Sequence, residues 1–331
     1  MTDFEAPEST SEQAAAWVFF STLVVGTFLA NAWPSAAASA DSAARLEELE
    51  AGWQTQLADP QVAAVAGSLS LLVLMLFGVG SVKAFLALKA DAAGHARAAF
   101  ADCEQLRLGP RRLPYFELVS LFLLALILVG GVAANLASRL DSQLPLLLNW
   151  VCAGVFAWPL LRGKSAAEIR LALGWHRGEG FFKEIAAGLA AYLTAWPLLA
   201  VGLVFTAGLS RLIAERPTHP LLDWIEDPSP GALVVAALLA VVWAPLCEES
   251  VFRGAFYAYL RGRLGKLGAG LAVGLAFAAI HPQGLAGIPF LASLALALAL
   301  TREWRGSIIA SVTMHALHNG LAVLGLVLIL R

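Results

Sequence analysis

The chain has few charged residues for its length. Only 14% of its 331 residues are Asp, Glu, Lys or Arg, whereas 59% are hydrophobic. A soluble domain typically has about 25% charged and about 45–50% apolar residues, so this composition excludes an ordinary soluble protein and indicates a polytopic membrane protein. The formal net charge of −2 does not indicate a partner, and no basic stripe suggests nucleic acid, so we expect no nucleic-acid partner and the lipid bilayer as the surroundings.

Cysteine is also scarce. The three cysteines, Cys103, Cys152 and Cys247, lie far apart and include no CxxC pair, which excludes a disulfide framework and a thiolate zinc site. A nucleophilic role for Cys247 stays open because Glu248 follows it directly, although a free cysteine is more commonly a small buried residue. The HExxH spacing of zinc proteases is absent.

The chain contains many long apolar segments. A membrane helix needs about 20 consecutive apolar residues, and no segment alternates with period two as the strands of a membrane barrel do. We therefore predict an all-α, polytopic transmembrane helical bundle. Its membrane helices number about nine, at about residues 14–33, 61–82, 115–137, 145–161, 184–208, 230–250, 267–281, 284–301 and 306–330.

Lys and Arg are concentrated in alternate loops. The connections after the even-numbered spans are rich in them, whereas the opposite loops hold only Arg45, Arg139, Arg211 and Arg216. By the positive-inside rule, this pattern predicts a cytoplasmic N-terminus and a C-terminus on the outer side. Together with the Ala/Leu/Arg-rich composition, it indicates an integral protein of a bacterial inner (plasma) membrane.

Ionisable side chains within the late apolar spans form three sets, and the first is Glu248-Glu249-Ser250-Val251-Phe252-Arg253. Adjacent residues on a helix point about 100° apart, so Glu248 and Glu249 cannot share one role. Because Arg253 is four residues from Glu249, we expect the two to touch and to hold Glu249 ionised and oriented. Glu248 is then the freer carboxylate and the better candidate for activating water. The alternative is an interfacial charge cluster at a helix end.

The second set is Phe277-Ala278-Ala279-Ile280-His281, followed by Pro282, which ends or kinks the helix. Counted from Leu264 in the basic turn, His281 and Glu248 lie roughly 25 Å and roughly 24 Å along their helices, at about 1.5 Å per residue. The two side chains therefore meet if the helices form an antiparallel hairpin. A lone histidine at a helix end is more commonly a satisfied polar residue, but beside Glu248 a catalytic role is favoured.

The third set contains His315 and Asn319, which share a helix face, and His318 at the side of that face. An imidazole and an amide on one face can donate hydrogen bonds to a developing oxyanion, although interhelical hydrogen bonding is the simpler alternative. Histidine and carboxylate also suit zinc. No cofactor is favoured, but a divalent metal held by Glu248, His281 and His315 stays open.

The ordered motifs EExxxR, FxxxH and HxxxN on late membrane helices resemble those of the CPBP family. That family comprises the type II CAAX-prenyl endoproteases and bacterial proteins related to bacteriocin self-immunity. The motifs lie within about residues 230–325, and the segment 171–177 (LALGWHR) looks like the short cytoplasmic lead-in common in that family. We expect residues 145–331 to form the membrane-embedded protease core. Residues 1–144, with further membrane helices and a cytoplasmic connector, contain no recognisable motif.

The resemblance implies an intramembrane endopeptidase that hydrolyses a peptide or membrane-tethered protein in a cavity open toward the cytoplasm. The family is often labelled a metalloprotease, yet its carboxylate chemistry can be written without a metal. In the roles carried over from the family, water is activated by Glu248 and His281, the oxyanion is stabilised by His315 and Asn319, and the site is supported by Glu249 and Arg253.

Two other classes of function compete with proteolysis. A non-catalytic scaffold or bacteriocin-immunity protein would use the same fold to bind a partner and would hydrolyse nothing. A transporter would use the same polar groups as a proton relay, but the chain has no evident internal repeat of the kind from which many transporters are built. The sequence does not name the substrate.

Overall fold

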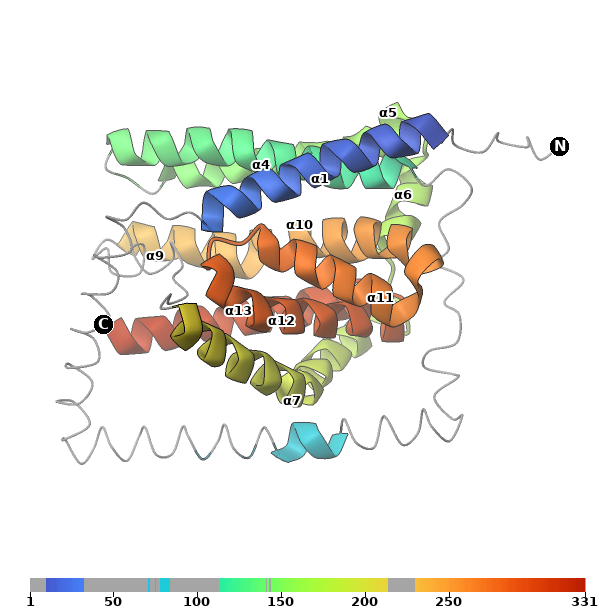
Figure 1. The fold of residues 1–331 in the computed structure, drawn as a ribbon. Coiled ribbons are helices and arrows are strands. Elements are labelled where there is room, and N and C mark those ends of the chain that lie inside the picture. The colour runs from blue at the N-terminus through green and yellow to red at the C-terminus, as the bar shows by residue number, and fades with distance from the viewer. Residues whose placement is uncertain are drawn as a thin grey trace.

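All regular secondary structure is helical over the residues that the computed structural model describes, which are 10–32, 71, 75, 78–83, 113–140, 142, 144–213 and 230–330. Figure 1 shows the helices lying roughly parallel to one another in a layered bundle. The all-α bundle predicted from the sequence is confirmed.

The N-terminal helix α1 (Thr10–Ala32) lies beside α4 (Leu113–Leu140), and a 3-10 helix, η3 (Leu144–Ala157), continues into the short α5 (Trp158–Leu161). The remaining elements, in chain order, are α6 (Ala166–Leu173), α7 (Phe181–Ile213), α9 (Pro230–Ala237), η4 (Leu238–Trp243), α10 (Ala244–Glu248), η5 (Glu249–Phe256), α11 (Tyr257–Ala279), α12 (Gly284–Arg305) and α13 (Ile309–Leu330). Elements η4 and η5 are π-helical.

Among the described residues, six helices are long and apolar enough to cross a membrane: Leu113–Leu140, Leu144–Leu161, Phe181–Ile213, Gly231–Ala279, Gly284–Arg305 and Ile309–Leu328. The segment Gly231–Ala279 contains two of the predicted spans, the sixth and the seventh. The first predicted span corresponds to α1, which is not among these six, and the second, 61–82, lies largely outside the described residues.

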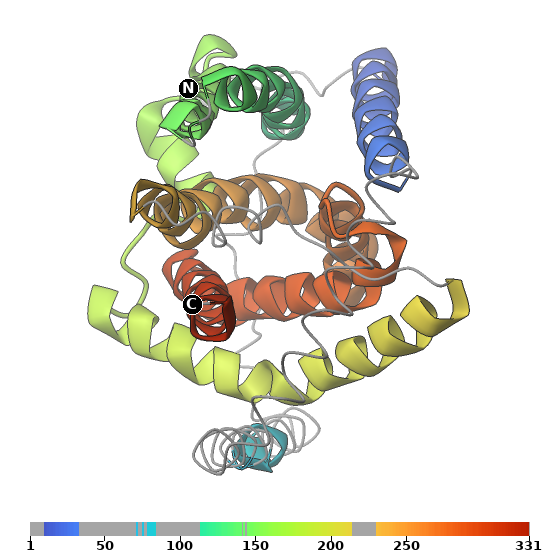
Figure 2. The ribbon, with the colours of Figure 1, turned by 90° about the vertical axis from the view of Figure 1, so that its left-hand side faces the viewer.

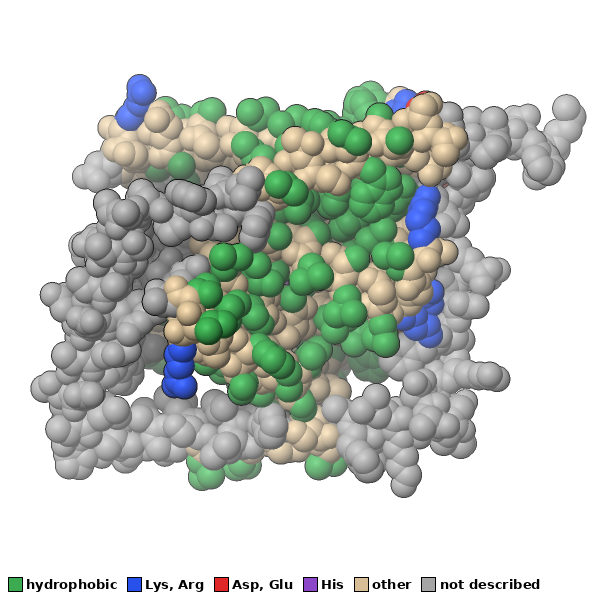
Figure 3. Space-filling model, in the orientation of Figure 1, with side chains coloured by type: hydrophobic (Ala, Val, Ile, Leu, Met, Phe, Trp, Pro, Cys, Tyr) green, Lys and Arg blue, Asp and Glu red, His purple; other side chains and the backbone are tan. Residues whose placement is uncertain are grey.

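The surface agrees with a membrane setting. In Figure 3, hydrophobic side chains cover the middle of the visible face, and the Lys and Arg side chains lie near the two ends of the helices. The chain is therefore an integral membrane protein.

The 49-residue segment folds back on itself at Gly265. This residue has φ of 70° and ψ of −178° and interrupts the helical backbone inside α11. Only glycine adopts such a conformation without strain, so the helix reverses there. Beyond the turn the chain returns alongside η5, and the rings of Phe252 and Phe277 stack edge to face with centroids 5.2 Å apart. The antiparallel hairpin expected from the sequence is present.

Helix α7 contains Pro197 and bends near its middle, as Figures 1 and 2 show. Proline removes a backbone donor and clashes with the preceding turn, which accounts for a bend at this position. The bent helix packs against α12 and α13. Two of its glycines allow this approach, because a Cβ at Gly188 would meet the Ala310 carbonyl oxygen at 2.5 Å and one at Gly202 would meet the Ser293 hydroxyl at 2.5 Å.

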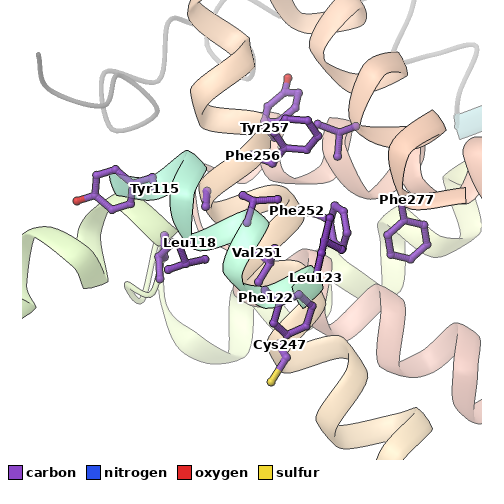
Figure 4. Close-up of a cluster of buried hydrophobic side chains, with 14 of the residues drawn as sticks. Tyr115, Leu118, Phe122, Leu123, Cys247, Val251, Phe252, Phe256, Tyr257 and Phe277 are labelled. Carbon is purple, nitrogen blue, oxygen red and sulfur yellow. The ribbon is translucent and has the colours of Figure 1, made fainter. Parts of the chain in front are cut away.

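The main hydrophobic core lies between α4 and the helix that carries the two glutamates. Figure 4 shows Leu118 and Phe122 of α4 facing Val251, Phe252 and neighbouring side chains. These side chains are at most 1% exposed. Between membrane helices such close packing stabilises through van der Waals contact, so α4 supports η5 along this surface.

Candidate active site

Glu249 and Arg253 form a fully buried ion pair on η5. Arg253 Nη1 donates to Glu249 Oε1 at 2.8 Å, and both side chains are 0% exposed. The guanidinium also donates from Nη2 to the Ala295 carbonyl oxygen at 3.1 Å and lies 4.7 Å from the centroid of the Phe277 ring. A buried ion pair is tolerated only when it is well paired and hydrogen-bonded, so this arrangement fixes η5 against α11 and α12.

Glu248 points away from this pair, as expected for the neighbouring residue on a helix. Its Oε2 lies 3.9 Å from Nε2 of His281, which is in the turn just after α11. The same Oε2 is buried and makes no hydrogen bond to any residue that the structure describes. The ring of His281 is held from the other side, where Nδ1 lies 2.6 Å from the Phe277 carbonyl oxygen. That carbonyl only accepts, so Nδ1 carries the hydrogen and Nε2 of the neutral ring presents a lone pair toward Glu248.

His315 joins the first motif to the third. Its Nδ1 lies 3.0 Å from Oε1 of Glu249, the same oxygen that accepts from Arg253. The ring is 3% exposed. The structure therefore connects Arg253, Glu249 and His315 in one buried chain of charge-assisted hydrogen bonds.

Asn319 donates a hydrogen bond to the backbone carbonyl of Ala240, which has no donor within its own helix. In η4 the amide of Ala244 donates to Leu239 rather than to Ala240, and residue 245 is proline and has no N–H. The Ala240 carbonyl oxygen is thus left without a helical donor, and Asn319 Nδ2 fills its place at 2.7 Å. The amide nitrogen of asparagine has two hydrogens, so one remains for another acceptor. Proline at 245 was the sequence signal for this contact, and sequence reasoning missed it.

His318 lies on a different side of α13. Its Nδ1 is 3.3 Å from the Tyr192 hydroxyl of α7, and its ring centroid is 5.7 Å from that of Phe290 on α12. The structure thus separates His318 from the Glu249–His315 contact and places it in the interface between α7, α12 and α13.

The divalent-metal set considered from the sequence is not gathered in this structure. Over the described residues, no group of three His, Cys, Asp or Glu side chains is placed to hold one metal ion. His315 directs Nδ1 at the neighbouring Glu249, and Glu248 faces His281 across 3.9 Å. Because the three side chains are not grouped around one point among the described residues, we route no chemical step through a metal.

Sequence reasoning also missed the contact between Trp175 and Ser250. Trp175 Nε1 donates to the Ser250 hydroxyl at 2.9 Å, directly beside Glu249 in the chain. The two residues are 75 positions apart, and no local pattern links them. A cavity of about 460 Å³ adjoins this contact, and its lining includes Trp175, Cys247 and Ser250.

A comparison with known protein families matches the part of the chain that contains the three motifs. Residues 230–321 match the model of the type II CAAX prenyl endopeptidases described as Rce1-like, and all six predicted site residues lie inside this range. Comparisons with curated proteins and with solved structures gave no match. This match over residues 230–321 agrees with the resemblance of the motifs to the type II CAAX prenyl endopeptidases.

Proposed function

We propose that the chain is an intramembrane endopeptidase of the CAAX type that uses a carboxylate-activated water. The observation that carries this proposal is the pair Glu248 and His281. Two ionisable side chains from separate apolar helices face each other at 3.9 Å, and the carboxylate oxygen between them has no other partner among the described residues. Such groups are costly within a membrane and are retained chiefly where they do chemistry.

Glu248 is the general base in this mechanism. Two polar atoms 3.9 Å apart can both contact one water molecule, so Glu248 Oε2 and His281 Nε2 can orient the attacking oxygen together. Glu248 takes a proton from the water as its oxygen bonds to the carbonyl carbon of the peptide. The resulting tetrahedral intermediate collapses when the C–N bond breaks and the leaving amine receives that proton.

His315 and Asn319 are the groups that stabilise the oxyanion. Asn319 keeps one N–H beyond the hydrogen bond to Ala240. His315 offers Nε2, because Nδ1 is occupied by Glu249. Glu249 and Arg253 position this ring and balance its charge and do not contact the substrate themselves. Donors held ready for a developing charge are commonly the largest single contribution to such catalysis.

The substrate is a peptide or a membrane-tethered protein segment, and the chain lies in a bacterial inner membrane. The turn at 261–266, α6 and the α12–α13 turn lie at one end of the bundle (Figure 1), and their Lys and Arg residues support a cytoplasmic position for that end. The active site opens toward this side. We propose that residues 145–331 are the protease core and that α4, within residues 1–144, supports η5 through the shared hydrophobic core.

Cleavage of a labelled peptide library by the detergent-purified full chain tests the function. The wild type is compared with Glu248→Gln and with Glu117→Gln, a matched control whose carboxylate binds Trp158 and Arg162 away from the site. The proposal is supported if Glu248→Gln alone loses cleavage and a chelator leaves cleavage by the wild type unchanged. Loss with a chelator and recovery with zinc would instead make the histidines metal ligands.

No cleavage by a folded wild type would overturn the enzyme proposal. The non-catalytic reading, a scaffold or bacteriocin-immunity protein, would then account for the same fold, and Glu248→Gln would retain the cellular phenotype.

A further inference from the structure

Residues 174–176, here called the strap, lie between η5, which carries Glu249, and the turn before α13, the helix that carries His315. The strap follows α6 and precedes α7 in the chain, and its residues are Gly174, Trp175 and His176. It contacts η5 on one side and the α12–α13 turn on the other. The mechanism proposed above assigns it no role.

On the η5 side, the strap and the end of α6 make two contacts. Trp175 Nε1 donates to Ser250 Oγ at 2.9 Å, and Ser250 is 3% exposed. One turn further along η5, Gly254 lies against the backbone of Leu173, because a Cβ at this glycine would meet the Leu173 carbonyl oxygen at 2.8 Å. The two contacts fix the helix that carries Glu249.

On the other side, three hydrogen bonds tie the strap to residues 306–308. The Ile308 amide donates to the Gly174 carbonyl oxygen at 2.9 Å, and the Ser307 hydroxyl donates to the His176 carbonyl oxygen at 2.7 Å. His176 Nε2 donates to the Gly306 carbonyl oxygen at 2.9 Å, since a carbonyl only accepts. Ser307 and Ile308 are fully buried and immediately precede α13, so the strap fixes the start of the helix that carries His315.

Gly174 allows the strap to pass this close. Its φ is 87°, which favours glycine, and it ends α6. A Cβ at this position would lie 2.5 Å from a guanidinium nitrogen of Arg302, whose side chain is fully buried and donates to the Gly306 carbonyl oxygen. The strap, the end of α12 and the start of α13 therefore pack as one unit.

We propose that Trp175 and His176 are positioning residues for the peptide hydrolysis proposed above, because the strap holds η5 and α13 at the separation that the Glu249–His315 contact requires. His315 is six residues into α13, or about 9 Å along a helix at about 1.5 Å per residue. Because the helix is rigid, a displacement of the first turn of α13 also displaces the imidazole ring of His315. Reacting groups misplaced by about 1 Å lose up to about a hundredfold in rate, so a small loosening of the strap is visible in kcat.

The test compares two tryptophan variants of the full chain. Trp175→Phe keeps an aromatic ring and removes the hydrogen bond to Ser250. Trp158→Phe is the matched control, because Trp158 Nε1 donates a similar bond of 2.8 Å to Glu117, away from the site. We expect Trp175→Phe to lower kcat about tenfold with little change in KM, and Trp158→Phe to leave both within about twofold.

Four further variants test the two sides of the strap separately. The double variant Trp175→Phe/Ser250→Ala should lose no more than Ser250→Ala or Trp175→Phe alone, because one hydrogen bond is removed only once. His176→Gln should retain more activity than His176→Ala, since the glutamine amide can still donate to the Gly306 carbonyl. Faster hydrogen exchange confined to η5 and residues 306–312 in Trp175→Phe would report the loosening independently of activity.

The proposal rests on the proposed function, and the two fail differently. A wild type that cleaves no peptide removes the function, and the positioning role falls with it. A wild type that cleaves, with Glu248→Gln inactive and Trp175→Phe equal to Trp158→Phe, overturns the positioning role alone. Hydrogen exchange that rises equally across α7 and the rest of the bundle also overturns it, because the variant then acts through general stability.

Discussion

Nδ1 of His315 lies 3.0 Å from Oε1 of Glu249, and that oxygen also accepts from Arg253 at 2.8 Å. A carboxylate paired with arginine is an acceptor only, so the hydrogen between the ring and Glu249 lies on Nδ1. In the neutral ring, Nε2 is then a lone pair and not a donor. A donor role for His315 toward an oxyanion therefore requires the doubly protonated ring, with Glu249 as the balancing charge.

The two nitrogens of this ring can be tested separately. In His315→Asn, the side-chain amide reaches about the position of Nδ1 and can still bind Glu249, but nothing replaces Nε2. We expect this variant to stay folded and to lose about a hundredfold or more in kcat, as when one oxyanion donor is removed. Peptide cleavage and the thermal unfolding midpoint, measured on the same preparation, check this. Full activity in His315→Asn would show that Nε2 takes no part.

Removal of the charge on Arg253 should destabilise the protein more than removal of a surface arginine. Arg253→Met leaves the buried Glu249 without its arginine and with only the contact to His315, and breaking a buried ion pair costs about 3–5 kcal/mol. Arg162→Met breaks an ion pair with Glu117 whose side chains are 40% and 22% exposed, and such partly exposed pairs contribute about 1 kcal/mol or less. Denaturant unfolding in detergent compares the two. Equal losses would mean that Glu249 is neutral in the folded protein.

Much of the site could be predicted from spacing within single helices. The Glu249–Arg253 pair follows from a separation of four residues, and the meeting of Glu248 with His281 follows from equal distances to one basic turn. Both arguments use only helix geometry and one hairpin. They succeed because the helix that returns after Gly265 packs directly on the helix before it.

Contacts that depend on the packing of distant helices could not be predicted in this way. The contact between His315 and Glu249 spans 66 residues and joins two separate helices, so no spacing within one helix predicts it. Trp175 binds Ser250 across 75 residues, and Asn319 binds Ala240 only because the helix widens near Pro245. The sequence pattern within one helix does not predict which residue of another helix it will contact, so these contacts are seen only in the tertiary structure.

Glycine 254 should be far less tolerant of substitution than a glycine on an open helix face. In Gly254→Ala, the new methyl group would lie 2.8 Å from the Leu173 carbonyl oxygen and 3.1 Å from its Cα, and backbone atoms cannot rotate away. Overpacking of this kind costs about 1–3 kcal/mol. Gly208→Ala in α7 meets nothing within 4 Å and should be neutral or stabilising by up to about 1 kcal/mol. Similar unfolding midpoints for the two variants would contradict the close packing of α6 on η5.

The stability of the strap should fall at acidic pH through His176. The ring is neutral in the folded protein, because Nε2 donates to the Gly306 carbonyl while Nδ1 accepts from the Gly178 amide at 3.2 Å. Burial, followed by the positive charge of Arg302, lowers the pKa of His176 below its ordinary value of about 6.5, although the Gly306 bond and Glu184 act the other way and Arg170 adds to the lowering.

The sign of the effect follows from proton uptake. Below about pH 6.5 the unfolded chain protonates this histidine while the folded chain does not, so stability is fully present above that pH and is lost as pH falls toward the lowered pKa. The difference in unfolding midpoint between about pH 7.5 and about pH 5.5 should therefore be larger in the wild type than in His176→Gln, whose amide does not titrate in this range. The difference between the two proteins isolates residue 176 from the other histidines. Equal pH dependence in both would mean that the proton does not disturb the contact with Gly178, and that this half of the strap is insensitive to the charge of the ring.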